Sequence, residues 1–104
     1  MKLYFFTYLA RPKMGSESFE SYGGAYVNCW IDAPSEAEAA ERASTAISRS
    51  GWDIESLEHS SLVTREAYAD DDEGLRHFEQ ALIDKEFYVF HTWPPGPQEN
   101  DSVD

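Results

Sequence analysis

The first strand that the sequence predicts, residues 3–10 (LYFFTYLA), is apolar on both faces. Successive side chains of a strand leave on opposite sides, so every second residue shares a face. A strand with one face toward water carries polar residues at alternate positions. Here both faces are apolar, and each needs a cover. The two faces hold Leu3, Phe5, Thr7 and Leu9 on one side and Tyr4, Phe6 and Tyr8 on the other.

Three later segments continue the extended pattern. Residues 25–32 (AYVNCWID) and 86–93 (EFYVFHTW) again carry large aromatic residues on their second faces. Residues 52–64 also alternate, but the alternation slips after Ile54, which predicts a bulge or a bend. The sequence therefore predicts about four strands.

A helix follows Pro34. Ser35 and Glu38 fit the S-x-x-E capping box, and Gly51 supplies a left-handed stop. Small side chains recur between them at helical spacing, which favours close packing on a sheet. These positions are Ala39, Ala40, Ala43, Ala46 and Ile47.

A second helix is predicted over DDDEGLRHFEQALIDK, residues 70–85. Asp70 and Glu73 fit a second capping box. An amphipathic stripe follows at Leu75, Phe78 and Leu82.

Two segments are predicted to lack regular structure. Residues 11–24 have no apolar periodicity and are predicted to form a long loop. Residues 94–104 are predicted to form a disordered, Pro-rich acidic tail that follows a single domain at residues 1–93.

This order of elements predicts an α+β fold, a two-layer sandwich with a mixed sheet of about four strands and two helices on one face. The helix-facing set is predicted to hold Leu3, Phe5, Val27, Ile31 and Val89. The opposite set then holds seven aromatic residues, with on the order of 1,000 Å² of contact area, comparable to one side of a standard interface. They are Tyr4, Phe6, Tyr8, Tyr26, Trp30, Tyr88 and Phe90.

A monomer rarely exposes so large an apolar patch, so something is expected to cover it. Three alternatives could bury this face: a second copy in a homodimer, a different protein, or the loop 11–24 folding back with Phe19 and Tyr22. Two-fold dimers are the commonest oligomers, which favours the homodimer.

Residues 25–58 resemble the strand, Ala-rich helix, Gly-Trp, strand unit of small uncharacterised bacterial proteins with ferredoxin-like folds. The resemblance implies a ferredoxin-like fold or a variant of it, and no activity. Domains of this kind often pair sheet to sheet into dimeric α+β barrels that hold an organic ligand between the sheets. The chain departs from the βαββαβ order, because a loop joins its first two predicted strands.

Charge narrows the classes of partner. The chain has 20 acidic and 8 basic residues, a net charge of −12, which disfavours nucleic-acid binding and favours a basic protein partner. Its one cysteine, Cys29, permits no intrachain disulfide. No stretch is long enough to span a bilayer, and the apolar run at residues 3–10 lacks a cleavage site, so we expect no membrane association and a cytoplasmic location.

Candidate chemistry is sparse. Asp70, Asp71, Asp72 and Glu73 form an acidic cluster, and Glu73 shares a helix face with His77 at i, i+4, as metal ligands do. Capping of the helix is the favoured explanation of these carboxylates over divalent-cation binding, so we predict no metal and no cofactor. His59 and His91 have the chemistry of general bases, but simple alternation turns His91 toward the helices, and Cys29 is expected in the core. No catalytic motif is present, and no catalytic residue is assigned.

Two functions follow from these patterns. The first is a non-catalytic interaction domain that self-associates through the aromatic face and binds a basic partner, as an immunity or inhibitor protein does. The second is a small-ligand-binding protein or enzyme of the dimeric α+β barrel type, with Tyr8, Tyr26, Trp30 and His91 near its cleft.

Overall fold

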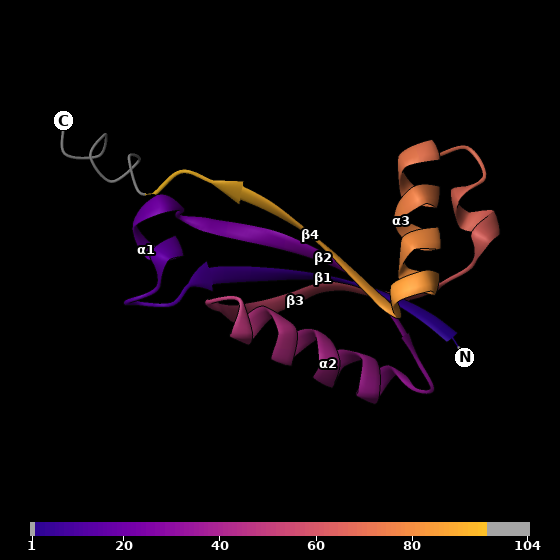
Figure 1. The fold of residues 1–104 in the computed structure, drawn as a ribbon, viewed down its shortest axis with the longest axis horizontal. Coiled ribbons are helices and arrows are strands. Elements are labelled where there is room, and N and C mark those ends of the chain that lie inside the picture. The colour runs from indigo at the N-terminus through magenta and orange to yellow at the C-terminus, as the bar shows by residue number, and fades with distance from the viewer. Residues whose placement is uncertain (1, 96–104) are drawn as a thin grey trace.

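The computed structural model describes residues 2–95 (Figure 1). Its strands are β1 (Lys2–Pro12), β2 (Gly24–Ala33), β3 (Trp52–Val63) and β4 (Glu86–Trp93). Its helices are α1 (Glu17–Ser21), α2 (Glu36–Arg49), α3 (Asp72–Asp84) and the 3-10 helix η1 (Arg65–Tyr68). The four predicted strands and two predicted long helices are all present, which confirms an α+β fold. Of the predicted tail, residues 96–104 lie outside the described residues.

The strands form one open sheet in the order β3-β1-β2-β4. Each neighbouring pair is antiparallel, so the sheet is not mixed as predicted. The expected parallel crossover is still present between β2 and β3, because both run antiparallel to β1, which lies between them. A chain that leaves β2 through α2 therefore passes over β1 before it pairs again.

Local signals explain where α2 begins and ends. The Ser35 side chain accepts a hydrogen bond from the Glu38 backbone N–H at 3.2 Å, as the capping motif predicts. At the other end Gly51 has φ +93°, a left-handed conformation that glycine adopts without steric cost. The buried positions are Ala39, Ala43 and Ile47, so small side chains let α2 lie close to the sheet.

The predicted irregularity in β3 is confirmed. Glu55 is an extra residue in the pairing with β1, directly after Ile54, and Glu58 is a second one. Each bulge bends and twists an edge strand.

The segment between the first two strands, residues 11–24, is not entirely a loop as predicted, since five of its residues form the short helix α1.

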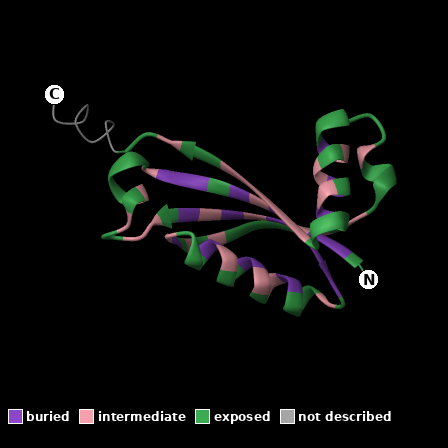
Figure 2. Ribbon diagram, viewed as in Figure 1, coloured by how far each residue is buried: buried purple, intermediate pink, exposed green. Residues whose placement is uncertain are grey.

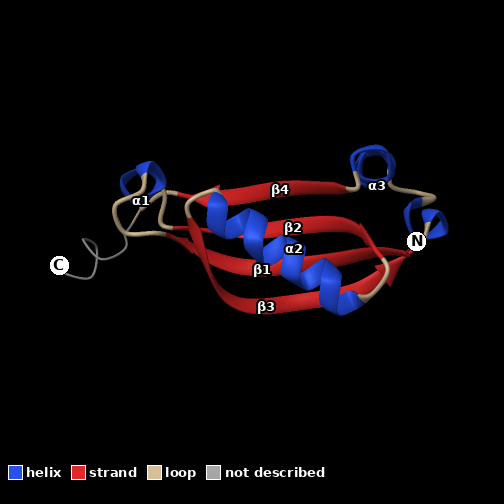
Figure 3. Ribbon diagram, turned by 60° about the horizontal axis from the view of Figure 1, so that its bottom comes forward, coloured by secondary structure: helices blue, strands red, loops and turns tan. Residues whose placement is uncertain are grey.

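The two long helices cover opposite faces of the sheet, whereas we expected them on one face. Figures 1 and 3 show α2 lying diagonally across one face and α3 standing at one end of the other. The α2 side contains the larger core, which includes Phe6, Val27, Cys29 and Ile31. The α3 side contains a smaller one, built from Leu3, Trp30, Phe78 and Ala81. Both faces of β1 are thus covered at its N-terminal end (Figure 2).

The prediction that seven aromatic residues share one uncovered face is wrong. The pairing places Tyr4 opposite Ile31 and Phe6 opposite Cys29, so these rings lie beneath α2. Tyr8, Tyr88 and Phe90 pack in the same core. Tyr26 and Trp30 face the other way. The interface role assigned to the seven residues stays a prediction. Of their side chains Tyr26 is exposed, Tyr88 and Phe90 are partly exposed, and the other four are buried within this chain.

Burial in the α2 core changes the acidity of three groups. It raises the pKa of Tyr8 to about 12 and that of the Cys29 thiol to about 12. The pKa of Tyr88 is also raised, by burial first and then by the hydrogen bond its hydroxyl donates to Glu86. Each group favours its neutral form when folded. A raised pKa therefore stabilises the folded state against unfolding. This contribution is complete at pH values below the unfolded-state pKa and is lost as the pH rises toward the folded-state pKa.

Replacing Tyr8 by Phe is expected to flatten this alkaline loss of stability. The variant keeps the ring but has no phenol to ionise, so between pH 10 and 12 its free energy of unfolding should fall less than the parent's, by roughly 1–2 kcal/mol. Urea unfolding at a series of pH values, each protein referenced to its own value at neutral pH, measures the difference. Parallel profiles for parent and variant would show that Tyr8 does not contribute.

Candidate binding cleft

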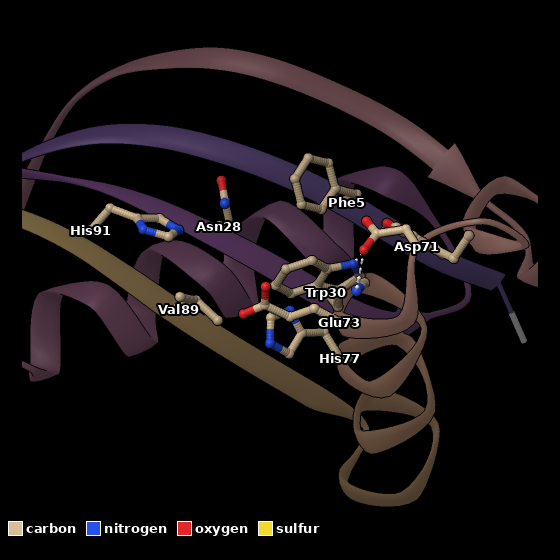
Figure 4. A pocket seen from close by; sticks show the side chains of 10 residues that line it. Phe5, Asn28, Trp30, Asp71, Glu73, His77, Val89 and His91 are labelled. Atoms are coloured by element: carbon tan, nitrogen blue, oxygen red, sulfur yellow. Dashed lines mark hydrogen bonds between the residues drawn. The ribbon is translucent and has the colours of Figure 1, made fainter.

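A cleft of about 360 Å³ lies where α3 meets the uncovered part of the sheet (Figure 4). The sheet contributes Phe5, Asn28, Trp30, Val89 and His91. The helical side contributes Tyr68, Asp71, Glu73, Gly74 and His77. The cleft exists because α3 covers only one end of this face, so the sheet continues beyond the helix without a cover.

Trp30 joins the sheet to the helical side of the cleft. Its side chain is 4% exposed, and its indole Nε1–H donates a hydrogen bond to the Tyr68 hydroxyl at 2.9 Å. Its ring centroid lies 5.0 Å from that of Phe5 and 5.0 Å from that of His77. Trp30 is therefore covered by this chain's own α3 and η1. A second molecule is not needed to bury it.

His77 extends the same packing. Its ring stacks on Phe87, with centroids 5.1 Å apart and an interplanar angle of 29°. The next residue, Phe78, is buried, and its ring centroid lies 5.7 Å from that of Tyr68. The predicted stripe is correct at Phe78, but Leu82 is exposed and Ala81 takes its place in the core.

The N-terminus of α3 forms one rim of the cleft. Its N-cap is Asp71, one residue later than the predicted Asp70, and the Asp71 Oδ1 accepts the Gly74 backbone N–H at 3.0 Å. A Cβ at Gly74 would come within 2.5 Å of the Asp71 carboxylate and 2.6 Å of the Tyr68 ring. The absence of a side chain at Gly74 thus allows the capping carboxylate and the Tyr68 ring to approach the helix closely.

The cleft is lined by two carboxylates and two imidazoles, and none of its ten lining residues is Lys or Arg. Glu73 and His77 both line it, as their predicted i, i+4 spacing on one helix face requires. Glu73 makes no hydrogen bond or ion pair with another side chain within residues 2–95, whereas Asp71 is engaged as the cap. Among those same residues, no three His, Cys, Asp or Glu side chains gather as metal ligands do.

The sheet side of the cleft adds two polar groups, Asn28, which the sequence patterns did not single out, and the predicted cleft residue His91. Asn28 interrupts the apolar pattern of β2, and its Oδ1 accepts a hydrogen bond from the Thr7 hydroxyl at 2.8 Å. His91 lies on the face of Val89, as alternation predicted, and it is exposed and lines the cleft because α3 covers only one end of that face. The sequence signal that could have identified Asn28 as a cleft residue is its position as a polar residue within an apolar strand.

Of the four residues predicted near a ligand cleft, the structure brings two together. Trp30 and His91 line it. Tyr26 lies on the same face, 44% exposed and 5.5 Å from the Trp93 ring between centroids, but outside the cleft. Tyr8 lies in the core on the opposite face. Tyr68 was missed, because its role depends on a tertiary contact with Trp30.

The remaining candidates for chemistry lie elsewhere. Cys29 is fully buried in the α2 core, as expected, and is remote from the cleft face. His59 Nε2 lies 3.3 Å from the Ser61 hydroxyl on the exposed edge strand β3, and the His59 ring packs 5.8 Å from Phe5 between centroids. Neither His59 nor Ser61 lines the cleft.

No protein-family model, curated protein or solved structure matches this chain. The resemblance to ferredoxin-like bacterial proteins therefore stays a prediction. Within residues 2–95 no helix has the length and apolar character needed to cross a membrane.

Replacing Trp30 by Ala should destabilise the domain by about 3–5 kcal/mol, because it removes the largest side chain of the α3-side core and the hydrogen bond to Tyr68. The matched control is Tyr26→Ala on the same strand and face, where the ring is 44% exposed and the expected loss is about 1 kcal/mol or less. Denaturant unfolding measures both. Equal losses would contradict the view that α3 is held to the sheet through Trp30.

Proposed function

We propose that this protein is a non-catalytic interaction domain that binds a basic segment of a protein partner in the cleft between α3 and the sheet. The observation that carries the proposal is the lining itself. Two carboxylates and three aromatic residues surround the cleft, and no cationic side chain lines it. An Arg or Lys side chain combines a cationic head with an apolar stem, which is the pattern that such a lining accommodates.

The charge of the whole chain supports the same class of partner. A net charge of −12 attracts a basic protein from a distance and speeds its association. Long-range attraction does not by itself select a binding position. The cleft supplies that selection, since its walls of Phe5, Trp30 and Tyr68 exclude water from one side of a bound side chain.

A small cationic molecule is the second candidate, and a specific observation favours it. The volume of about 360 Å³ falls within the range of small-molecule sites, and the imidazoles of His77 and His91 add hydrogen-bonding groups. Free arginine amide and an arginine-rich peptide distinguish the two occupants. A peptide that binds far more tightly than its isolated residue supports the protein partner, and equal affinity supports the small ligand.

Charge-removing variants at the rim of the cleft test the proposal. Glu73→Gln removes a carboxylate without changing its shape, and Asp71→Asn removes another while keeping a side-chain oxygen that can cap α3. Each should weaken binding of an arginine-rich peptide about three- to tenfold, the range expected for one partly exposed ion pair with cation–π contact. Isothermal titration of the full chain at low salt measures the affinities.

Glu20→Gln is the matched control for these variants. It removes one negative charge from α1, at the opposite end of the sheet (Figure 1), and should leave the affinity nearly unchanged. If Glu20→Gln weakens binding as much as Glu73→Gln, the peptide senses the net charge of the chain and not the cleft. Absence of binding to any arginine-rich peptide at low salt would overturn the proposed partner class.

A further inference from the structure

The two edges of the sheet differ in how they are protected. An edge strand presents unpaired backbone groups, and charges or bulges usually prevent it from pairing with another strand. The edge strand β3 has both protections, because Glu55 and Glu58 form bulges in it. The other edge, β4, pairs with β2 in an unbroken register and carries no charged residue from Phe87 to Trp93.

The hydrogen bonding identifies which backbone groups of β4 are free. The Asp32 N–H donates to the Lys85 carbonyl at 2.9 Å, which makes residues 32 and 85 a hydrogen-bonded pair at the end of the β2–β4 ladder. Because such pairs alternate along antiparallel strands, Phe87, Val89 and His91 turn their backbone groups toward β2. The backbone N–H and C=O groups of Tyr88, Phe90 and Thr92 therefore point away from the sheet.

We propose that the β4 edge pairs, antiparallel and two-fold symmetric, with β4 of a second copy of this chain. A pairing centred on Phe90 sets Phe90 opposite Phe90 of the second copy, and Tyr88 opposite its Thr92. The side chains of Tyr88 and Phe90 are half-buried in one molecule, so they retain apolar surface that a second copy covers. The outward-facing backbone groups of both strands gain hydrogen bonds.

Charge favours a second copy over a basic partner at this edge. Two chains of net charge −12 repel each other over most of their surfaces, so they associate best where carboxylates are absent. The β4 edge is such a place, since Glu86 lies at the beginning of the strand and accepts the Tyr88 hydroxyl hydrogen bond at 2.8 Å. A basic partner finds no carboxylate to pair with along these seven uncharged residues. An identical uncharged strand can approach them without charge repulsion.

The inference is independent of the proposed function, because it uses the strand edge and not the cleft. Side chains of Val89 and His91 line the cleft, whereas the pairing uses backbone groups of the residues between and beyond them. Glu73→Gln should therefore change peptide binding without changing the mass of the protein in solution. The two proposals fail separately.

Thr92→Pro is the direct test of the pairing. Proline removes the outward N–H of Thr92 but leaves the ladder with β2 intact, and an edge strand tolerates it where the N–H faces solvent. Sedimentation equilibrium over a wide concentration range should give twice the 11.8 kDa of one chain for the parent and one chain for the variant. Thr92→Val keeps the N–H and should remain dimeric.

Thr92→Lys gives a second measurement if Thr92→Pro fails to fold. Thr92 is exposed, so the lysine does not disturb the core, and it places an ammonium group against Tyr88 of the other copy at both ends of the pairing, which should also yield a monomer. In the parent dimer, amide exchange at Tyr88, Phe90 and Thr92 should be slow and should accelerate on dilution. A parent that stays monomeric at the highest concentration, or a dimer that survives both substitutions, overturns the proposal.

Discussion

The structure depends on one constraint: the central strand β1 is apolar on both faces, so each face needs its own cover. A single layer of helices cannot satisfy it. The chain divides its two long helices between the faces, with α2 over Phe6 and α3 beside Leu3. The cover on the α2 side is long and continuous, and the cover on the α3 side ends partway along the sheet. The cleft is the boundary where that second cover stops.

The four strands and the two long helices could be predicted from the sequence because their signals are local, whereas the short helices α1 and η1 could not. The cap at Ser35, the left-handed stop at Gly51 and the slip after Ile54 all act through neighbouring backbone, and the structure contains each of them. Pairing between strands is different. Alternation predicts which residues of one strand share a face, but not which face of the neighbouring strand lies on the same side of the sheet. A register shift by one residue moves every side chain of a strand to the opposite face. That shift assigned Tyr4 to the same face as Trp30, although they lie on opposite faces.

Part of the cleft was visible in the sequence for the same reason. Glu73 and His77 share a helix face through local geometry, and both line the cleft. What brings them to Trp30 is not local, since it depends on which face of the sheet α3 covers. Tyr68 shows the limit most clearly. It lies in a short 3-10 helix with no periodicity of its own, and its role comes from tertiary contacts, namely the hydrogen bond from the Trp30 indole and the packing on Phe78.

The strand β4 links the two proposed surfaces, because a strand offers its side chains and its backbone in perpendicular directions. Val89 and His91 turn their side chains into the cleft and their backbone groups toward β2. Tyr88 and Phe90 turn their side chains to the α2 core and their backbone groups outward. A second strand bound at the edge therefore leaves the cleft open while it restrains one of its walls. The aromatic side chains at the even positions Tyr88 and Phe90 complete the α2 core, and the absence of charge from Phe87 to Trp93 is the property on which the proposed pairing of two acidic chains depends.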